Sequence, residues 1–522
     1  MSRWLPVGDV LRVNATLYPD KEGAADLYRS LTFREWNERC NRLANALLKM
    51  GLVKGDRIAF IGHNSLTWME FYGATAKNGL IGVPIMFRLA PLEYQYILEN
   101  SGAKAFLVAQ EFIEGVESIR GKLPAVEHWI YLGDGQPPEG YVGYEELMAS
   151  GSPEECPIKV NHQDVWTIMY TSGTTGKPKG VVRTHESYVG FYLTNIVAME
   201  YNKHDRGLLV MPMCHINSIF YAFSFTYCCA TAVVYNMTSF DPEHLLKTLA
   251  EAKITFTSLV PTHYIMILSL PGEIKNAYDM SSIKKLLCSS APARKDTKMG
   301  ILEFFKNSQL YEAYGSTEAG LVTLLYPEEQ FDKLGSIGRE IPGTELLKLL
   351  DEKGDKVAPG EVGELYSNGA ALFTEYWKMP KETEAAFKGE WFSAGDMARQ
   401  DADGYYYLVD RKKNMIITGG ENLYPSEVES LVGSHPAVKD VAVIGVPDEK
   451  WGERVTAVVV LHQDHKPGPE LAEGIREFCQ GKIAGFKRPK EIRFIADEEM
   501  PRTATGKILH RALRERFGDW TK

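Results

Sequence analysis

The 522-residue chain lacks several features that would place it in common classes of protein. Its seven cysteines form no Cys-x-x-Cys pair and no metal-ligand spacing with histidine, and Cys228 and Cys229 lie in an apolar run, as reduced core thiols do. The N-terminus has no apolar secretory segment, so we expect a reducing, cytoplasmic location. Positive charge is not in excess, because 58 Lys and Arg against 68 Asp and Glu give a net charge of −10. This balance argues against nucleic-acid binding.

The stretch from Gly207 to Phe240 contains no Asp, Glu, Lys or Arg. Its length would suffice to span a bilayer. Polar residues and a proline interrupt it, however, among them Pro212, His215 and Asn236. These interruptions favour a buried strand–helix–strand core over a transmembrane helix, so we expect no integral membrane span.

The pattern of the first four hundred residues alternates between helix and strand. One helix is expected to open with a capping box at Thr32–Glu35, and a strand is expected at Arg57–Ile61. A second alternation runs from Pro242 to Leu310. Such alternation predicts an α/β fold with helix-covered parallel sheets, in two subdomains.

The pattern changes after Ile337, where short strands such as Glu361–Tyr366 and Asp401–Leu408 predict a β-rich portion. A polar cluster at Asp410–Asn414 then suits a boundary or hinge. We therefore predict a large N-terminal domain over residues 1–410, with two helix-covered sheet subdomains and a β-rich portion. A small, mobile α+β domain follows over residues 411–522.

The segment Ser172–Gly180 is rich in glycine, hydroxyl groups and lysine, and it lies between two apolar strand-like runs. Glycine lets backbone N–H groups approach a phosphate closely. A Walker loop needs four residues between its glycines and Ser or Thr after its lysine. Here only two residues separate Gly173 and Gly176, and Pro178 follows Lys177. The segment is therefore interpreted as a phosphate-binding loop of another architecture.

Further motifs are spread along the chain: Ser289-Ser-Ala-Pro292, Tyr311-Glu-Ala-Tyr-Gly-Ser-Thr-Glu318, Trp391-Phe-Ser-Ala-Gly-Asp396, Asp410-Arg-Lys-Lys-Asn414 with Gly419-Gly420, and Pro501-Arg-Thr-Ala-Thr-Gly-Lys507. With Tyr170–Gly180 they resemble the adenylate-forming superfamily, which contains acyl-CoA synthetases, adenylation domains of peptide synthetases and firefly luciferase. Acyl-CoA synthetases are the most similar class. Two departures are Ser289-Ser290 in place of two glycines and Ala394 in place of the usual threonine.

The resemblance implies that ATP, Mg²⁺ and coenzyme A are bound. It implies that Glu318 ligates Mg²⁺ and that Thr317 bonds the α-phosphate, while Tyr314 stacks on adenine. The other implied nucleotide contacts are Thr171, Ser172, Gly173, Thr174, Thr175, Gly176, Lys177 and Lys179 for the phosphates, and Ser290, Ala291, Pro292 and Gly315 around the base.

The resemblance also assigns roles towards the C-terminus. Asp396 and Arg411 would hold the ribose, and Lys413 would be the pivot about which the small domain rotates. Gly420 would lie against the pantetheine arm of CoA, and Lys507 would reach the nucleotide during adenylation.

The acyl pocket is implied to include His215, Asn217, Phe220, Ser316 and Leu321. His215 could equally be a core histidine whose hydrogen bonds are satisfied internally. The lining is apolar, and no Arg or Lys is evident in it to pair a second carboxylate. We expect an apolar monocarboxylate: medium-chain, branched, alicyclic or aromatic.

The predicted function is an ATP-dependent carboxylic acid–CoA ligase that acts through an acyl-AMP, with a small-molecule acid, ATP and CoA as its partners. The alternatives are a stand-alone enzyme that loads a carrier-protein phosphopantetheine and a luciferase-like oxygenase. A degenerate, non-enzymatic scaffold would be expected to have lost Lys507, Glu318 or Asp396, and all three are present. A homodimer is left open.

Overall fold

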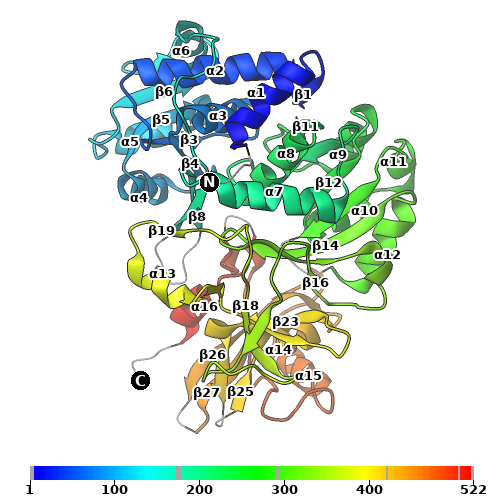
Figure 1. Cartoon of the computed structure of the whole chain (residues 1–522). Coiled ribbons are helices and arrows are strands. Elements are labelled where there is room, and N and C mark those ends of the chain that lie inside the picture. The colour runs from blue at the N-terminus through cyan, green and yellow to red at the C-terminus, as the bar shows by residue number, and fades with distance from the viewer. Residues whose placement is uncertain are drawn as a thin grey trace. The chain divides into compact units, whose positions relative to one another are not determined.

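The computed structural model describes residues 5–171, 178–289, 293–418, 421–448, 450–503 and 506–518. The chain divides into two compact units (Figure 1). The first comprises Met1–Leu347 and Ser367–Phe392, and the second comprises Lys348–Tyr366 and Ser393–Lys522.

An eight-stranded sheet forms one half of the first unit. Its strands, from edge to edge, are β19 (Glu375–Tyr376), β9 (Lys179–Thr184), β8 (Val165–Thr171), β4 (Ile81–Ile85), β3 (Arg57–Ile61), β5 (Ala103–Ala109), β6 (His128–Leu132) and β7 (Val142–Gly143). Pairing from β8 to β7 is parallel, whereas β8, β9 and β19 pair antiparallel. The apolar strand β4 is buried along its whole length, as expected where helices cover a parallel sheet.

Five helices accompany this sheet in sequence: α2 (Phe33–Lys49), α3 (Leu66–Asn78), α4 (Pro91–Ser101), α5 (Ile113–Arg120) and α6 (Tyr144–Ser150). The capping box predicted for α2 is confirmed. Glu35 N–H donates to Thr32 Oγ1 at 3.2 Å, and Thr32 N–H donates to Glu35 Oε2 at 2.8 Å. Two N–H groups that the helix cannot pair internally are thereby satisfied.

A nine-stranded sheet forms the other half of the first unit. Its strands in order are β16 (Arg339–Glu340), β15 (Gly320–Leu325), β14 (Gln309–Ser316), β13 (Lys285–Ser289), β12 (Phe256–Leu259), β10 (Arg206–Leu209), β11 (Thr231–Val234), β1 (Glu22–Ala25) and β2 (Ser30–Thr32). The stretch without acidic or basic residues folds into β10, α8 (Ile216–Tyr227) and β11, as predicted. No helix among the described residues is long and apolar enough to cross a membrane.

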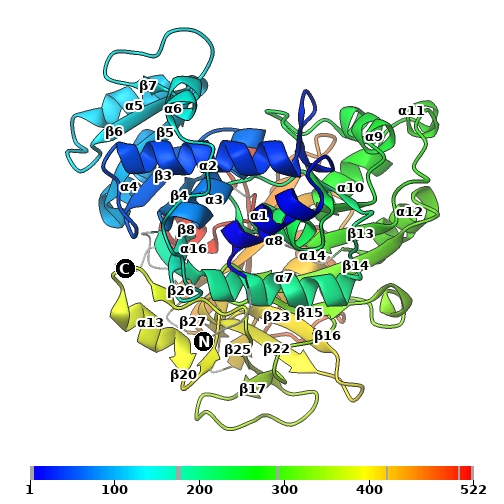
Figure 2. The same ribbon diagram turned by 45° about the horizontal axis from the view of Figure 1, so that its top comes forward.

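The remaining helices near this sheet are α1 (Val7–Leu17), α7 (His185–Met199), α9 (Pro242–Glu251), α10 (Pro261–Leu268), α11 (Gly272–Asn276) and α12 (Lys295–Phe304). Helix α7 connects the two halves, because it contacts β9 of one sheet and both α8 and β15 of the other. Figure 2 shows α7 and, below it in yellow, α13 (Pro380–Ala386) and β20 (Phe387–Lys388). Strand β21 (Trp391–Phe392) pairs with β20.

The second unit contains two smaller sheets. One is antiparallel, in the order β17 (Lys348–Leu350), β18 (Val362–Tyr366), β22 (Asp396–Gln400) and β23 (Tyr406–Arg411). The other has the order β25 (Glu421–Leu423), β24 (Ile416–Thr418), β27 (Gly452–Leu461) and β26 (Val438–Asp448), with β28 (Glu491–Phe494) on β27. Its helices are α14 (Pro425–Gly433), α15 (Pro469–Phe478) and α16 (His510–Phe517).

The fold class is as predicted, with one local correction. The expected strand at Asp401–Leu408 begins only at Tyr406. The Asp401 carboxylate accepts hydrogen bonds from the N–H groups of Asp403 and Tyr405, which makes the start of that segment a turn. The domain limits at residues 410 and 411 stay a prediction.

Candidate active site

The glycine-rich segment connects two neighbouring strands. Strand β8 ends at Thr171 and β9 begins at Lys179, and antiparallel pairing places these two residues opposite each other. The intervening residues of the prediction, Ser172, Gly173, Thr174, Thr175, Gly176 and Lys177, lie outside the described residues, as do Ser290, Ala291, Pro292 and Gly420. Their contacts stay predictions.

Thr317 and Glu318 lie between β14 and β15. Glycine is required at Gly315, because a Cβ there would overlap the carbonyl oxygen of Gly320. Ala319 N–H donates to Ser316 Oγ at 3.0 Å, and Phe373 N–H donates to the Glu318 carbonyl at 2.7 Å. The backbone of this turn is thus held from within and by the segment around Phe373.

The Glu318 carboxylate is held by a residue that the sequence analysis missed. The Tyr376 hydroxyl donates to Glu318 Oε1 at 2.9 Å. Tyr376 lies on β19, where it pairs with Val181 of β9, and the Lys179 ammonium lies 4.5 Å from its ring centroid. We call Lys179, Glu318 and Tyr376 the carboxylate cluster. No local sequence signal identifies Tyr376, because its bond to Glu318 crosses 58 residues.

The chemistry of the carboxylate cluster fits the predicted magnesium ion. Mg²⁺ is commonly bound through one or two carboxylates together with phosphate oxygens of a substrate. The described residues contain no group of three or more His, Cys, Asp and Glu that could hold a metal ion by themselves. A single carboxylate near one end of the glycine-rich segment is therefore the donor set that the described residues offer.

His215 and Asn217 lie at the start of α8. His215 Nδ1 accepts from Asn217 N–H at 3.3 Å, so the histidine caps the helix. Asn217 Nδ2 donates to Ser258 Oγ at 3.2 Å and to Ser289 Oγ at 3.4 Å. These serines lie at the carboxyl ends of β12 and β13, where parallel sheets commonly bind ligands. Neither serine was among the predicted pocket residues.

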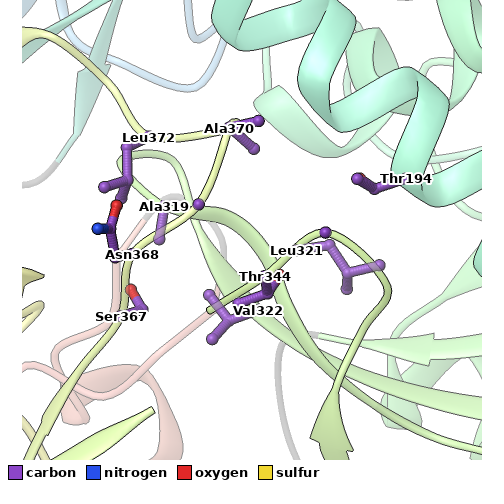
Figure 3. Close-up of a pocket in the computed structure, with 12 residues that line it drawn as sticks. Thr194, Ala319, Leu321, Val322, Thr344, Ser367, Asn368, Ala370 and Leu372 are labelled. Carbon is purple, nitrogen blue, oxygen red and sulfur yellow. The ribbon is translucent and has the colours of Figure 1, made fainter. Parts of the chain in front are cut away.

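A small pocket lies beside β15 (Figure 3). Leu321 and Val322 line it from the strand, Thr194 lines it from α7, and the segment 367–372 lines it from a loop. Of the predicted acyl-pocket residues, Leu321 lines this pocket, whereas His215, Asn217, Phe220 and Ser316 do not. Phe220 is buried and stacks on Phe191, with ring centroids 3.6 Å apart.

Asp396 and Arg411 are brought together in the second unit. They face each other across the paired strands β22 and β23, and Arg411 Nε lies 2.7 Å from Asp396 Oδ1. Arg411 Nη1 also donates to the Ala394 carbonyl at 2.8 Å. The Asp396 side chain is only 8% exposed, so its charge is partly removed from water.

Lys507 is electrostatically coupled to this pair. Its N–H donates to Thr503 Oγ1 at 3.1 Å, in a tight turn where Gly506 has a φ of 86°. Loss of hydration lowers the pKa of Lys507, and the positive charge of Arg411 lowers it further, while Asp396 acts in the opposite direction. We call Asp396, Arg411 and Lys507 the ribose-side cluster, after the role predicted for Asp396 and Arg411.

The predicted hinge contains Lys413, in the short helix η3 (Lys412–Asn414). Asn414 Nδ2 donates to Asp410 Oδ1 at 3.3 Å, and Ser426 N–H donates to Asp410 Oδ2 at 2.8 Å. Asp410 therefore ties the segment to the first turn of α14. Rotation about Lys413 stays a prediction.

Comparisons with known proteins match both parts of the chain. Residues 11–377 match the family described as AMP-binding enzyme, and residues 427–507 match the AMP-binding enzyme C-terminal domain. A feruloyl-CoA synthase of Amycolatopsis sp is 34% identical over 492 residues, which cover 94% of each chain. The fatty acid–[acyl-carrier-protein] ligase ScoC of Streptomyces coeruleorubidus is 32% identical over 507 residues, which cover 94% of this chain and 92% of that one.

One solved structure has a similar fold over nearly the whole chain. The anthranilate CoA ligase AuaEII in complex with anthranoyl-AMP superimposes with a TM-score of 0.88 and 29% sequence identity. The superposition covers 99% of this chain and 98% of that one.

Proposed function

Because the chain belongs to the family of AMP-binding enzymes, we propose that it is an ATP-dependent carboxylic acid–CoA ligase. In the first step an oxygen of the acid's carboxylate attacks the α-phosphorus of ATP, which forms acyl-AMP and releases pyrophosphate. In the second step the CoA thiol loses its proton and attacks the acyl carbon, which forms the thioester and releases AMP.

The observation that carries this proposal is the carboxylate cluster. It links the end of a glycine-rich segment to a carboxylate through one tyrosine, with a 2.9 Å hydrogen bond on one side and a 4.5 Å cation–π contact on the other. Phosphoryl-type transfers need positioning and charge neutralisation more than covalent help from the protein. Both are supported by a lysine and a carboxylate that contact the same tyrosine.

Glu318 would hold Mg²⁺, which when bound neutralises charge on the phosphates of ATP. Tyr376 would orient the carboxylate by its hydrogen bond to Oε1. Thr171 and Lys179, at the two ends of the glycine-rich segment, would bind phosphate oxygens with the residues between them. Thr317 would donate to the α-phosphate, and Tyr314 would stack on the base.

The ribose-side cluster supplies a second set of roles. A carboxylate accepts hydrogen bonds from two hydroxyls, so Asp396 would bind both ribose hydroxyls, assisted by Arg411. Lys507 would neutralise charge during adenylation and leave before the thiol attacks. We include in the proposal a large domain 1–410 and a small domain 411–522 that rotates about Lys413, because one site must serve two different reactions in turn.

The substrate is proposed to be an apolar monocarboxylate. Phe220 is buried among aromatic rings, which supports an apolar body. A panel of acids incubated with ATP and CoA tests this part. A preference for dicarboxylates or amino acids contradicts it.

A second candidate function is loading of a carrier-protein phosphopantetheine, which the similarity to an acyl-carrier-protein ligase favours. The deciding experiment measures ATP-, acid- and CoA-dependent thioester formation with no other protein present. Thioester formed from free CoA supports the ligase. Acyl-AMP that transfers only to an added phosphopantetheinylated carrier protein supports the second candidate.

A cytoplasmic location is also part of the proposal, because all seven cysteines are free thiols, as a reducing compartment keeps them. Fractionation of the producing cells tests it. A homodimer is proposed as the assembly, and sedimentation of the purified chain decides between one and two copies.

A further inference from the structure

Arg183 is a fully buried cation that the roles described above do not use. It lies on β9, after the glycine-rich segment, and its exposed fraction is 0%. Nη1 donates to the Thr317 carbonyl at 2.7 Å and to the Glu318 carbonyl at 3.4 Å. Nη2 donates to the Ala371 carbonyl at 2.6 Å and to the Ser187 carbonyl at 3.3 Å. Its guanidinium therefore joins the Glu318 turn to α7 and to the loop before β19.

Burial of the Arg183 charge costs more free energy than a residue needed only for packing would cost. All the hydrogen-bond acceptors of Arg183 are backbone carbonyls, and Nε is buried with no partner among the described residues. The rings of Tyr188 and Phe220 lie 5.0 Å from the guanidinium carbon. A buried charge without a carboxylate partner is expensive, and an apolar side chain would fill such a site with less loss of hydration.

The electrostatics point to Glu318. Burial lowers the pKa of Arg183, and the carboxylate of Glu318 is among the groups that oppose this shift. The guanidinium in turn attracts the Glu318 carboxylate. Arg183 thus acts on Glu318 in two ways: it donates a hydrogen bond to the Glu318 carbonyl, and its charge attracts the Glu318 carboxylate.

The loop that Arg183 holds leads directly to the other support of Glu318. Ala371 accepts from Arg183, Phe373 N–H donates to the Glu318 carbonyl, and Tyr376 donates to the Glu318 carboxylate. Loss of the guanidinium would leave the Thr317 and Ala371 carbonyls without this donor. Both the Glu318 turn and the segment leading to Tyr376 would then be free to shift.

We propose that Arg183 is a positioning residue for Glu318, which holds the turn so that the carboxylate is aimed at Mg²⁺ bound with ATP. This inference rests on the proposed function, in which Glu318 is the metal ligand. Substitution of Arg183 should therefore weaken the Mg²⁺-dependent part of ATP binding, and not only the stability of the fold.

The test measures ATP binding to the full-length protein by calorimetry, without acid or CoA, at increasing Mg²⁺. Mg²⁺ should strengthen ATP binding by the wild-type protein. In Arg183→Met the gain in ATP affinity that Mg²⁺ produces should be about tenfold smaller, as expected when charge-assisted hydrogen bonds are lost. Arg183→Lys keeps the charge without the planar fork, so an intermediate loss is expected.

The matched control is Arg39→Met on α2, a partly buried arginine that, among the described residues, contacts none of the carboxylate cluster. Arg39 ties the buried Glu70 at 2.6 Å and Glu145 at 2.7 Å, so its loss should lower the melting temperature. It should leave the Mg²⁺ dependence of ATP binding unchanged.

If Arg183→Met lowers the melting temperature but keeps the wild-type Mg²⁺ dependence, the positioning role is wrong. If Arg183→Met does not fold, the Mg²⁺ dependence of ATP binding is measured on Arg183→Lys. A wild-type Mg²⁺ dependence in Arg183→Lys then overturns the proposal.

The binding assay separates this inference from the proposed reaction. A wild-type protein that binds ATP with Mg²⁺ but forms no acyl-AMP with any acid contradicts the proposed function, while the Arg183 result still stands. A wild-type ATP affinity that does not respond to Mg²⁺ overturns the role of Arg183.

Discussion

The carboxylate cluster and the ribose-side cluster are built in different ways. Asp396 and Arg411 face each other across two consecutive antiparallel strands, so a local pairing brings them within 2.7 Å. Lys179, Glu318 and Tyr376 come from segments that are distant in sequence and meet through the edge strand β19. The first arrangement should tolerate changes in the surrounding core, whereas the second depends on the loop that Arg183 holds.

The largest effect is expected from Lys507→Ala. Removing the ammonium should slow acyl-AMP formation by about 100- to 1,000-fold, the range seen when one charge-stabilising donor is deleted. Thioester formation from supplied acyl-AMP should be largely retained. Pyrophosphate exchange and single-turnover thioester assays measure the two steps separately. Equal loss in both would show that this cluster does not serve one half-reaction only.

Removal of the Tyr376 hydroxyl should have a smaller effect on the carboxylate cluster. Tyr376→Phe deletes one hydrogen bond to Glu318 Oε1, so adenylation should slow about three- to tenfold. Raising the Mg²⁺ concentration should restore part of the loss. The control is Tyr141→Phe, which deletes a 2.7 Å hydrogen bond to Glu117 elsewhere in the unit. If Tyr141→Phe slows adenylation as much as Tyr376→Phe does, the role assigned to Tyr376 is wrong.

The pH dependence of adenylation should report the ribose-side cluster. Lys507 must be protonated to neutralise charge, so the rate should fall as pH rises through its lowered pKa. Arg411→Gln removes a charge that lowers this pKa, so the fall should move to higher pH. Arg476→Gln, which removes the partner of Glu473 on α15, should leave the profile in place. A shift to lower pH in Arg411→Gln would contradict the coupling.

The smallest effect is expected from Asn217→Leu, which concerns specificity. The change removes hydrogen bonds to Ser258 and Ser289 and makes the carboxyl ends of β12 and β13 more apolar. The ratio of kcat/KM for a purely aliphatic acid to that for a hydroxylated acid should rise about threefold. The control is Ser218→Ala on the same helix, which removes a hydrogen bond to the Met211 carbonyl. An unchanged ratio would place Asn217 outside the acyl site.

Much of the fold could be predicted because its signals are local. The capping box of α2 and strand β3 (Arg57–Ile61) were predicted at the positions observed. The strand expected at Asp401–Leu408 was placed too early, because an aspartate turn precedes β23. Apolar periodicity alone does not show where a turn ends and pairing begins.

The candidate site was predictable only where its residues form motifs. Glu318, Asp396 and Lys507 were predicted from the sequence around them, whereas Tyr376 and Arg183 were not. Arg183 follows the glycine-rich segment by a few residues, yet its four carbonyl acceptors come from three separate segments. A charge on a strand gives no sign in the sequence that it will be buried.

The amino-acid sequence by itself determined the order of helices and strands, the α/β class and the residue types that can bind phosphate, ribose and metal. These depend on side-chain period, caps and short motifs, which are properties of neighbouring residues. Only the tertiary structure decided that Tyr376 supports Glu318, that Arg183 lies behind it, and that Asn217 meets Ser258 and Ser289. Such contacts depend on strand order and on the packing of distant segments, which no local pattern encodes.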